Sequence, residues 1–154
     1  MMKRNVISLM LALLLIAALP MSVLAAEPAR VTAETEYFED GSYLVTTISE
    51  SAARASGTKT GSKSQSYYSA DGSLAWRATL TATFTYNGTT AGCTSVSCPV
   101  TIYNTAWSLV SRSTSRSGNT AKANFTMGYT SSSGSVSEYP YTITLVCDKY
   151  GNLS

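Results

Sequence analysis

The chain has no histidine among its 154 residues. Hydrolases that use a Ser-His-Asp or Cys-His arrangement are therefore excluded, and so is every imidazole metal site. Its three cysteines lack the spacing of zinc ligands. These absences predict a protein that is not an enzyme and that has no cofactor and no metal site.

Charged residues are also scarce, at 13% of the chain, and those present offer little acid–base chemistry. Glu34 and Glu36 would share one face of a strand, and we interpret them as solubilising groups. Lys59 and Lys63 lie in a Lys-Ser-Thr run that we expect to be exposed, which argues against a Ser–Lys catalytic pair.

Residues 1–25 have the pattern of a secretory signal peptide. Lys3 and Arg4 precede the apolar run Leu9–Leu19, and residues 23–25 supply a cleavage site of small residues. The run is shorter than the roughly 20 apolar residues of a spanning helix, and no second run follows it. We therefore predict a secreted, extracellular protein, free or associated with the cell wall, that does not insert into the membrane after cleavage.

Cleavage would remove two of the 11 basic residues. The remaining basic residues would then equal the 9 acidic residues in number, and the net charge would be zero. A neutral chain has no electrostatic basis for binding nucleic acid, so no nucleic-acid partner is expected. Acidic residues are concentrated in 26–50, whereas basic residues predominate in 51–154. We predict an acidic N-terminal β-hairpin (26–50), a linker (51–57) and a sandwich domain (58–154).

Apolar and polar residues alternate without interruption over 74–86, which is the period of a half-buried strand. An Asn-Gly pair at 87–88 then predicts a two-residue hairpin turn, which would pair Ala82 with Cys93. Other alternating segments and frequent turn signals bring the total to about eight or nine strands. The predicted fold is all-β: an antiparallel β-sandwich, immunoglobulin-like or similar, with a small β-barrel as the alternative.

Cysteine in an exported chain favours a disulfide, and three cysteines leave one over. Cys93 and Cys147 both fall on inward strand positions, so the predicted bridge is Cys93–Cys147, worth about 4 kcal/mol for a loop of this length. A Cys93–Cys98 bridge is the alternative, provided that the chain turns between them. Cys98 would otherwise be a free thiol or would link two chains in a disulfide dimer.

The aromatic residues divide into two groups. Trp76 and Trp107 fall on apolar-face positions and are predicted to pack in the core. Other tyrosines are less constrained by alternation, and a cluster among them is the candidate ligand surface: Tyr67, Tyr68, Tyr103, Tyr139 and Tyr150.

Several short segments after Gly57 resemble a known group of proteins. They are 58–60, 67–68, 83–88, 103–104 and 144–147, together with Trp76, Cys93 and Trp107. On these segments the chain is similar to small secreted hypothetical proteins of Gram-positive bacteria. The resemblance implies a fold and assigns no functional residue. It also favours the Cys93–Cys147 bridge, because Cys98 is extra relative to that pair.

Three functions fit these features. The first is a secreted, non-catalytic β-sandwich that binds a glycan or a protein at the cell envelope or in the extracellular environment, such as a cell-wall or host glycan. The second is a secreted antagonist of the bacteriocin or toxin type, suggested by small size and export. The third is a structural or matrix protein assembled through edge strands and Cys98. Export, neutrality and unconstrained tyrosines favour the first.

Overall fold

The computed structural model describes residues 30–50 and 56–154. The predicted signal peptide (1–25) and most of the predicted linker (51–55) lie outside the described residues. Within the described part the chain forms nine strands. They are β1 (Arg30–Tyr37), β2 (Tyr43–Glu50), β3 (Gly57–Tyr68), β4 (Leu74–Tyr86), β5 (Ala91–Ser97), β6 (Val100–Ile102), β7 (Trp107–Ser117), β8 (Thr120–Thr130) and β9 (Val136–Val146).

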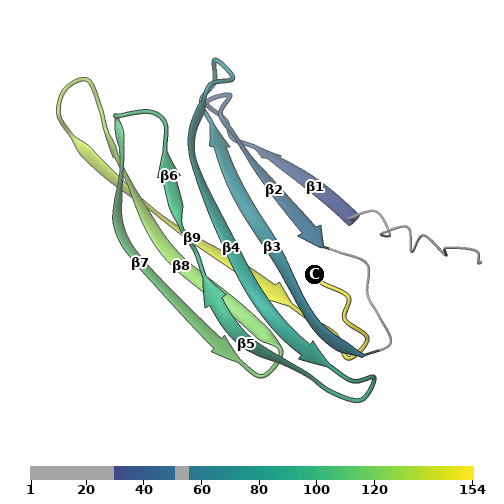
Figure 1. Cartoon of the computed structure of the whole chain (residues 1–154). Coiled ribbons are helices and arrows are strands. Elements are labelled where there is room, and N and C mark those ends of the chain that lie inside the picture. The colour runs from purple at the N-terminus through teal and green to yellow at the C-terminus, as the bar shows by residue number, and fades with distance from the viewer. Residues whose placement is uncertain (1–29, 51–55) are drawn as a thin grey trace, which may run out of the picture.

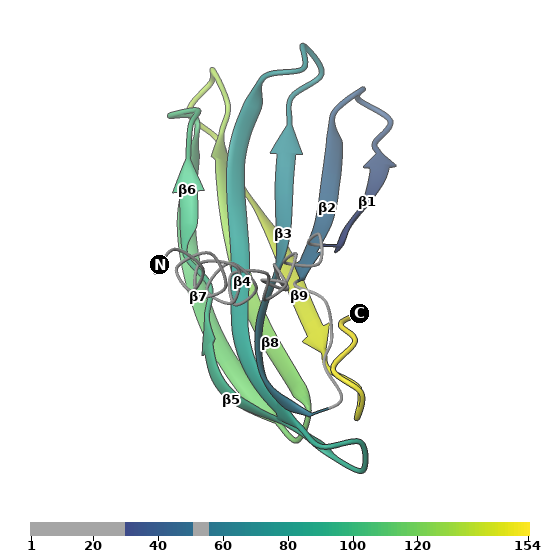
Figure 2. The same ribbon diagram turned by 45° about the vertical axis from the view of Figure 1, so that its right-hand side comes forward.

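The strands form two antiparallel sheets that pack face to face (Figures 1 and 2). The six-stranded sheet has the order β1-β2-β3-β4-β5, with β6 paired to β4, and the three-stranded sheet has the order β7-β8-β9. The sheets do not close into a barrel, so the predicted β-sandwich is confirmed and the barrel alternative is wrong. No helix of the described residues has the length and hydropathy that a membrane crossing requires.

The acidic hairpin is part of the larger sheet. β1 pairs with β2 over its full length, and β2 continues the pairing to β3. Gly57, which the sequence suggested as the end of a linker, is the first residue of β3. All eight residues of β1 are exposed, so this strand is an edge whose two faces meet solvent.

The core follows from the alternation along β4. Its inward side chains are buried and meet the inward side chains of β8 and β9, such as Phe125 and Ile143. Each large apolar side chain buried in this way contributes about 1.5–3 kcal/mol. The buried inward positions of β4 are Trp76, Ala78, Leu80, Ala82, Phe84 and Tyr86.

The β4–β5 hairpin has a different register from the predicted one. Tyr86 pairs with Ala91, which leaves a four-residue connection, and Phe84 rather than Ala82 pairs with Cys93. A two-residue turn of the expected type needs positive φ at both central residues, whereas none of the described non-glycine residues has positive φ. The Asn87 side chain instead accepts hydrogen bonds from the backbone N–H groups of the two threonines that follow the glycine, and these bonds hold a wider loop.

The predicted disulfides are not formed, and all three cysteines are free thiols. Cys93 does face inward as predicted, opposite Phe84, but its Sγ donates to the carbonyl of Ser95 at 3.3 Å, whereas the Cys147 Sγ donates to the carbonyl of Asp148 at 3.4 Å. Each thiol therefore turns to a carbonyl of its own segment. Cys98 is free, as the sequence suggested, but only 3% exposed, and this burial argues against a dimer linked through it.

One side of the sandwich is closed by arginines of β7. Arg112 donates to the carbonyl of Cys98 at 3.0 Å, and Arg116 donates to the carbonyls of Cys93 and Thr94. These guanidinium groups satisfy backbone acceptors at the edge of β5, so they join the two sheets where no strand pairing is available.

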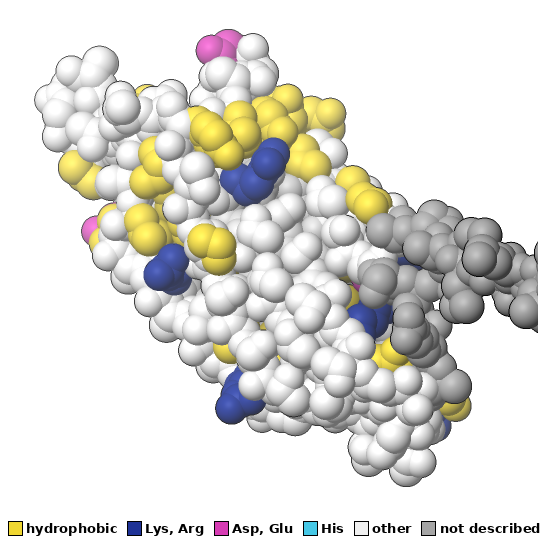
Figure 3. Space-filling view, viewed as in Figure 1, with side chains coloured by type: hydrophobic (Ala, Val, Ile, Leu, Met, Phe, Trp, Pro, Cys, Tyr) yellow, Lys and Arg dark blue, Asp and Glu magenta, His cyan; other side chains and the backbone are white. Residues whose placement is uncertain are grey.

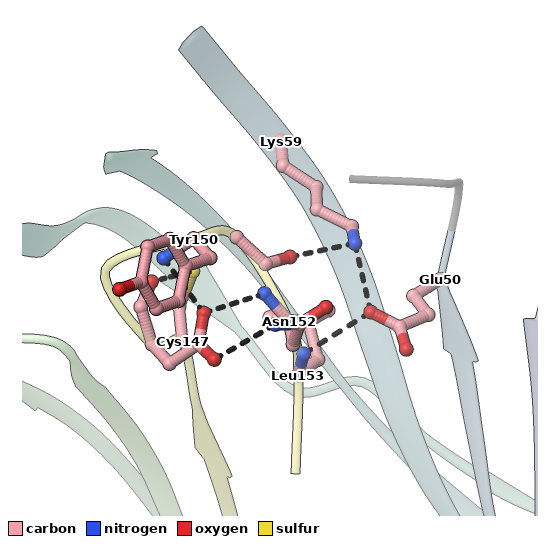
Figure 4. Close-up of polar contacts among 8 residues, drawn as sticks. Glu50, Lys59, Cys147, Tyr150, Asn152 and Leu153 are labelled. Carbon is pink, nitrogen blue, oxygen red and sulfur yellow. Dashed lines mark hydrogen bonds and ion pairs between the residues drawn. The ribbon is translucent and has the colours of Figure 1, made fainter. Parts of the chain in front are cut away.

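The C-terminal segment closes the other side through a buried ion pair (Figure 4). Lys59 Nζ lies 2.7 Å from Glu50 Oε2 and donates to the Gly151 carbonyl at 2.7 Å. The backbone N–H of Leu153 donates to the same Glu50 oxygen at 3.1 Å. The prediction that Lys59 is exposed is wrong, since it is 4% exposed. It lies opposite Phe84, so alternation aims it into the sandwich, where a carboxylate and a carbonyl replace water.

Alternation also aims Lys63 inward. It lies opposite Leu80 of β4 and Ile48 of β2 and is partly buried, so the expectation of full exposure is wrong for this residue too. Glu34 and Glu36 of β1 share a face, as predicted, and both are exposed. The polar run of β3 is therefore a sheet strand whose inward side holds Lys59 and Lys63, whereas Thr58 and Thr60 on its outward side are exposed.

Candidate binding cleft

A cleft of about 380 Å³ opens at the end of the sandwich opposite the buried ion pair. It lies between the β1–β2 and β3–β4 turns of one sheet and strands β7, β8 and β9 of the other. Volumes of this size suit small-molecule ligands. Six of its lining residues are aromatic: Phe38, Tyr67, Trp107, Tyr129, Tyr139 and Tyr141.

Trp107 is the centre of the aromatic cluster. Its ring centroid lies 4.9 Å from that of Tyr67, 5.1 Å from that of Tyr129 and 5.7 Å from that of Tyr139. The three tyrosine rings are tilted by 48–58° relative to the indole. At these distances and angles the tyrosine rings are in contact with the indole, so the four side chains pack as one cluster.

Trp76 supports the cleft from below. It stacks on Tyr67 with a centroid distance of 5.7 Å, and Tyr141 approaches it at 4.8 Å. Trp76 is fully buried and does not line the cleft itself. The cleft residues Tyr67 and Tyr141 are thus fixed by packing against the core, which limits the entropy that a ligand must remove on binding.

The β1–β2 turn supplies the polar side of the cleft. Asp40 Oδ1 accepts hydrogen bonds from the Ser42 backbone N–H at 2.9 Å and from its hydroxyl at 2.5 Å. These bonds hold the pKa of the Asp40 carboxyl below its ordinary value, so the group is negatively charged near neutral pH. Ser69 of the β3–β4 turn adds a second polar residue to the lining.

Burial changes the acidity of the tyrosines that line the cleft. It raises the pKa of the Tyr67 phenol; a side-chain hydrogen bond with Ser42 opposes this rise and the Asp40 charge adds to it. Burial likewise raises the pKa of Tyr141. Both phenols therefore stay neutral and keep their hydroxyl protons as hydrogen-bond donors.

The structure brings together two of the five predicted surface tyrosines, Tyr67 and Tyr139. Tyr68 belongs to a separate ladder on the outer face of the larger sheet, where it stacks on Tyr43 at 4.8 Å. Tyr103 is exposed beyond the end of β6, and Tyr150 is exposed in the C-terminal segment beneath the ammonium group of Lys149. These three residues form no joint surface with the cleft.

Figure 3 shows hydrophobic side chains gathered at the upper end of the molecule, over the β1–β2 and β3–β4 turns. The exposed Tyr37 contributes to this region and lies 5.5 Å from Tyr43 in the same ladder as Tyr68. The rings of Tyr43 and Tyr68 are stacked within 8°, so they cover each other's faces. This ladder ties the edge strand β1 to the sheet.

The predicted ligand surface did not include four of the aromatic residues that line the cleft: Phe38, Trp107, Tyr129 and Tyr141. The prediction that Trp107 packs in the core is confirmed, with 7% exposure, but its exposed part also forms the cleft. Tyr129 lies on the inward face of β8 near the end of the strand, and Tyr141 lies on the inward face of β9 at the middle of the strand. Alternation marks both residues as inward and carries no signal of which inward side chains line a cleft.

The cleft offers aromatic rings, phenol and serine hydroxyl groups and one carboxylate. The Ser42 hydroxyl donates a hydrogen bond to the Asp40 carboxylate. The lowered pKa of Asp40 makes this carboxylate a weak base. The Lys59–Glu50 pair is enclosed at the opposite end of the strands. Among the described residues no group of three His, Cys, Asp or Glu side chains is placed to hold a metal ion. The absence of enzyme activity stays a prediction.

A search of protein-family models, of curated proteins and of solved structures finds no match to this chain.

Proposed function

We propose that this protein is a secreted, non-catalytic binding module that holds a glycan in the cleft around Trp107, at the cell envelope or in the extracellular surroundings. The observation that carries the proposal is the convergence of six aromatic residues on a hollow of about 380 Å³. Aromatic walls accept the apolar C–H faces of a sugar ring, and neutral phenols and a carboxylate can bond its hydroxyl groups. Export and the likeness to small secreted proteins of Gram-positive bacteria belong to the same proposal.

The arrangement of the cleft favours this function over the two alternatives. An antagonist or a matrix protein does not require a preformed aromatic hollow, whereas a binding module does. The rings also rest on the rigid core through Trp76, so the cleft is formed before a ligand arrives. A glycan fits better than a flat protein surface because the site is concave and small.

The test is saturable binding of the purified protein to washed cell-wall sacculi and to mucin, followed in parallel by Trp fluorescence, to which Trp107 contributes. We expect Tyr139→Ala to weaken binding by about tenfold, because the ring forms one wall of the cleft. Tyr150→Ala is the matched control: Tyr150 is 54% exposed and Tyr139 is 43% exposed, and Tyr150 lies outside the cleft. The proposal is contradicted if the protein binds saturably to neither material. It is also contradicted if the two substitutions weaken binding equally.

A further inference from the structure

Six aromatic side chains line one hollow, and Trp107 is in contact with three of the tyrosines. Tyr67, Tyr129 and Tyr139 surround Trp107 with centroid distances of 4.9–5.7 Å and inclined planes. The face of an aromatic ring carries partial negative charge, and several faces around one hollow attract a cation without the need for a formal counter-ion. Indole gives the strongest attraction of the aromatic side chains, and Trp107 is in the centre.

The charges around the cleft have one sign. Asp40 lines it, and no Lys or Arg is among its lining residues. Glu36 lies on the same face of the sheet in the same row, since it pairs with Leu44 of β2, which in turn pairs with Tyr67 of β3. The Glu36 charge reaches Tyr141, because it contributes to the raised pKa of that phenol, after burial and the neighbouring tyrosines.

The basic residues on neighbouring parts of the strands do not line the cleft. Arg77 of β4 donates to the Ser66 hydroxyl at 2.8 Å. Arg112 bonds to a β5–β6 carbonyl. Lys63 is four residues along β3 from Tyr67 and does not line the cleft. The cleft therefore combines aromatic rings with the Asp40 carboxylate, has Glu36 in the same row of the sheet, and has no Lys or Arg in its lining.

We propose that the group held in this cleft is a quaternary or methylated ammonium group carried by the ligand. This inference rests on the proposed function and specifies the ligand chemistry of the same site. A primary ammonium brings three N–H donors that all need acceptors, whereas methylation replaces these donors with apolar surface. A cleft with aromatic walls and one carboxylate, Asp40, thus favours the methylated cation, whose methyl groups pack against the rings.

The test is a titration of the intact protein with choline and with 3,3-dimethyl-1-butanol, which has the same shape without the charge. We expect saturable quenching of Trp fluorescence by choline, with the neutral alcohol bound at least about tenfold more weakly. Equal affinities for the two compounds would overturn the inference.

Variants separate the charge effect from folding. Asp40→Asn retains the oxygen that accepts from Ser42, and Glu36→Gln retains the size of an exposed side chain. We expect each to weaken choline binding by several-fold. Glu138→Gln is the matched control, because Glu138 is exposed and adjacent to Tyr139 but points to the opposite face of β9. An equal loss in the control would overturn the inference.

The outcomes also distinguish this inference from the proposed function. If neither compound binds while sacculi or mucin still bind in a manner that depends on Tyr139, the ammonium inference is wrong and the glycan proposal stands. If neither the small compounds nor the envelope materials bind, both are wrong.

Discussion

Lys59 shows at the residue scale how a charge can be part of a core. It is 4% exposed and is held by Glu50 Oε2 and the Gly151 carbonyl, both at 2.7 Å. The same Glu50 oxygen also accepts from the backbone N–H of Leu153 at 3.1 Å, which ties the C-terminal segment to the pair. A buried pair of this kind is neutral or slightly unfavourable compared with apolar packing, but losing one partner is costly.

Replacement of Lys59 by methionine is therefore expected to lower the free energy of unfolding by about 3–5 kcal/mol, because an unpaired carboxylate stays buried. Urea denaturation measures this loss. Lys122→Met on the exposed face of β8 is the control and should change stability by no more than about 0.5 kcal/mol. The double substitution Glu50→Leu with Lys59→Met should recover most of the loss. Equal stability of the Lys59 and Lys122 variants would show that the pair is not buried in solution.

The turns and the C-terminal segment are the informative features at the element scale. Gly41 and Gly72 have φ of 83° and 81° and each follows an aspartate that accepts the backbone N–H of the next serine, Ser42 or Ser73. The C-terminal segment is not a free tail, because Val146 and Ser154 exchange backbone hydrogen bonds and Leu153 is buried. It acts as an additional element that covers the open side of the sandwich.

Gly151 and Gly134 provide a matched test of that segment. Both have positive φ, 86° and 83°, so alanine at either position costs about 1 kcal/mol in backbone strain. A Cβ at Gly151 would also lie 2.5 Å from the Tyr86 ring, whereas a Cβ at Gly134 meets nothing within 4 Å. We expect the free energy of unfolding of Gly151→Ala to be lower than that of Gly134→Ala by about 1–3 kcal/mol, which is the usual cost of overpacking. Equal melting temperatures would mean that the segment does not pack against Tyr86.

The two ends of the whole molecule differ in structure: one holds a buried ion pair and the other holds the aromatic cleft. The ion pair and the C-terminal segment lie where β2 ends and β3 begins, and they close the sandwich. The aromatic cleft lies at the other end, where turns and strand ends of both sheets meet around Trp107. The buried ion pair and the cleft therefore share no residue and lie at opposite ends of the strands, so substitutions at the two places are expected to have additive effects.

Three aspartates in turns, Asp40, Asp71 and Asp148, are expected to contribute to the stability of the protein in acid. Hydrogen bonds from Ser42, Ser73 and Asn152, respectively, hold the pKa of each carboxyl below the ordinary value of 3.8. A lowered folded-state pKa stabilises the native state above the unfolded value, and this contribution is lost as the pH falls through the folded pKa.

We therefore expect the urea concentration at the midpoint of unfolding to decrease as the pH is lowered from about 4 to about 2. Because Asn retains the acceptor oxygen without titrating, the triple substitution Asp40→Asn, Asp71→Asn and Asp148→Asn should flatten this dependence. An equally steep fall in the triple variant would assign acid sensitivity to other carboxylates.

Much of the fold was predictable because burial on a strand has period two. The alternation of β4 identified the core side of that strand, and Trp76 and Trp107 were correctly predicted as core residues. The polar strand β3 was misread, because Lys59 becomes an interior group only when Glu50 and the C-terminal segment converge on it. The sequence contains no local signal for that convergence.

The sequence by itself determined an all-β chain with its inward and outward faces, its aspartate-glycine turns and its lack of imidazole chemistry, because these properties depend on residue type and near-neighbour spacing. Tertiary structure alone decided which inward aromatics form the cleft. Tyr67, Tyr129 and Tyr139 come from three strands of two sheets, and their rings reach Trp107 because the fold brings these strands together. Packing between strands distant in sequence sets these contacts, and a period of two residues does not encode them.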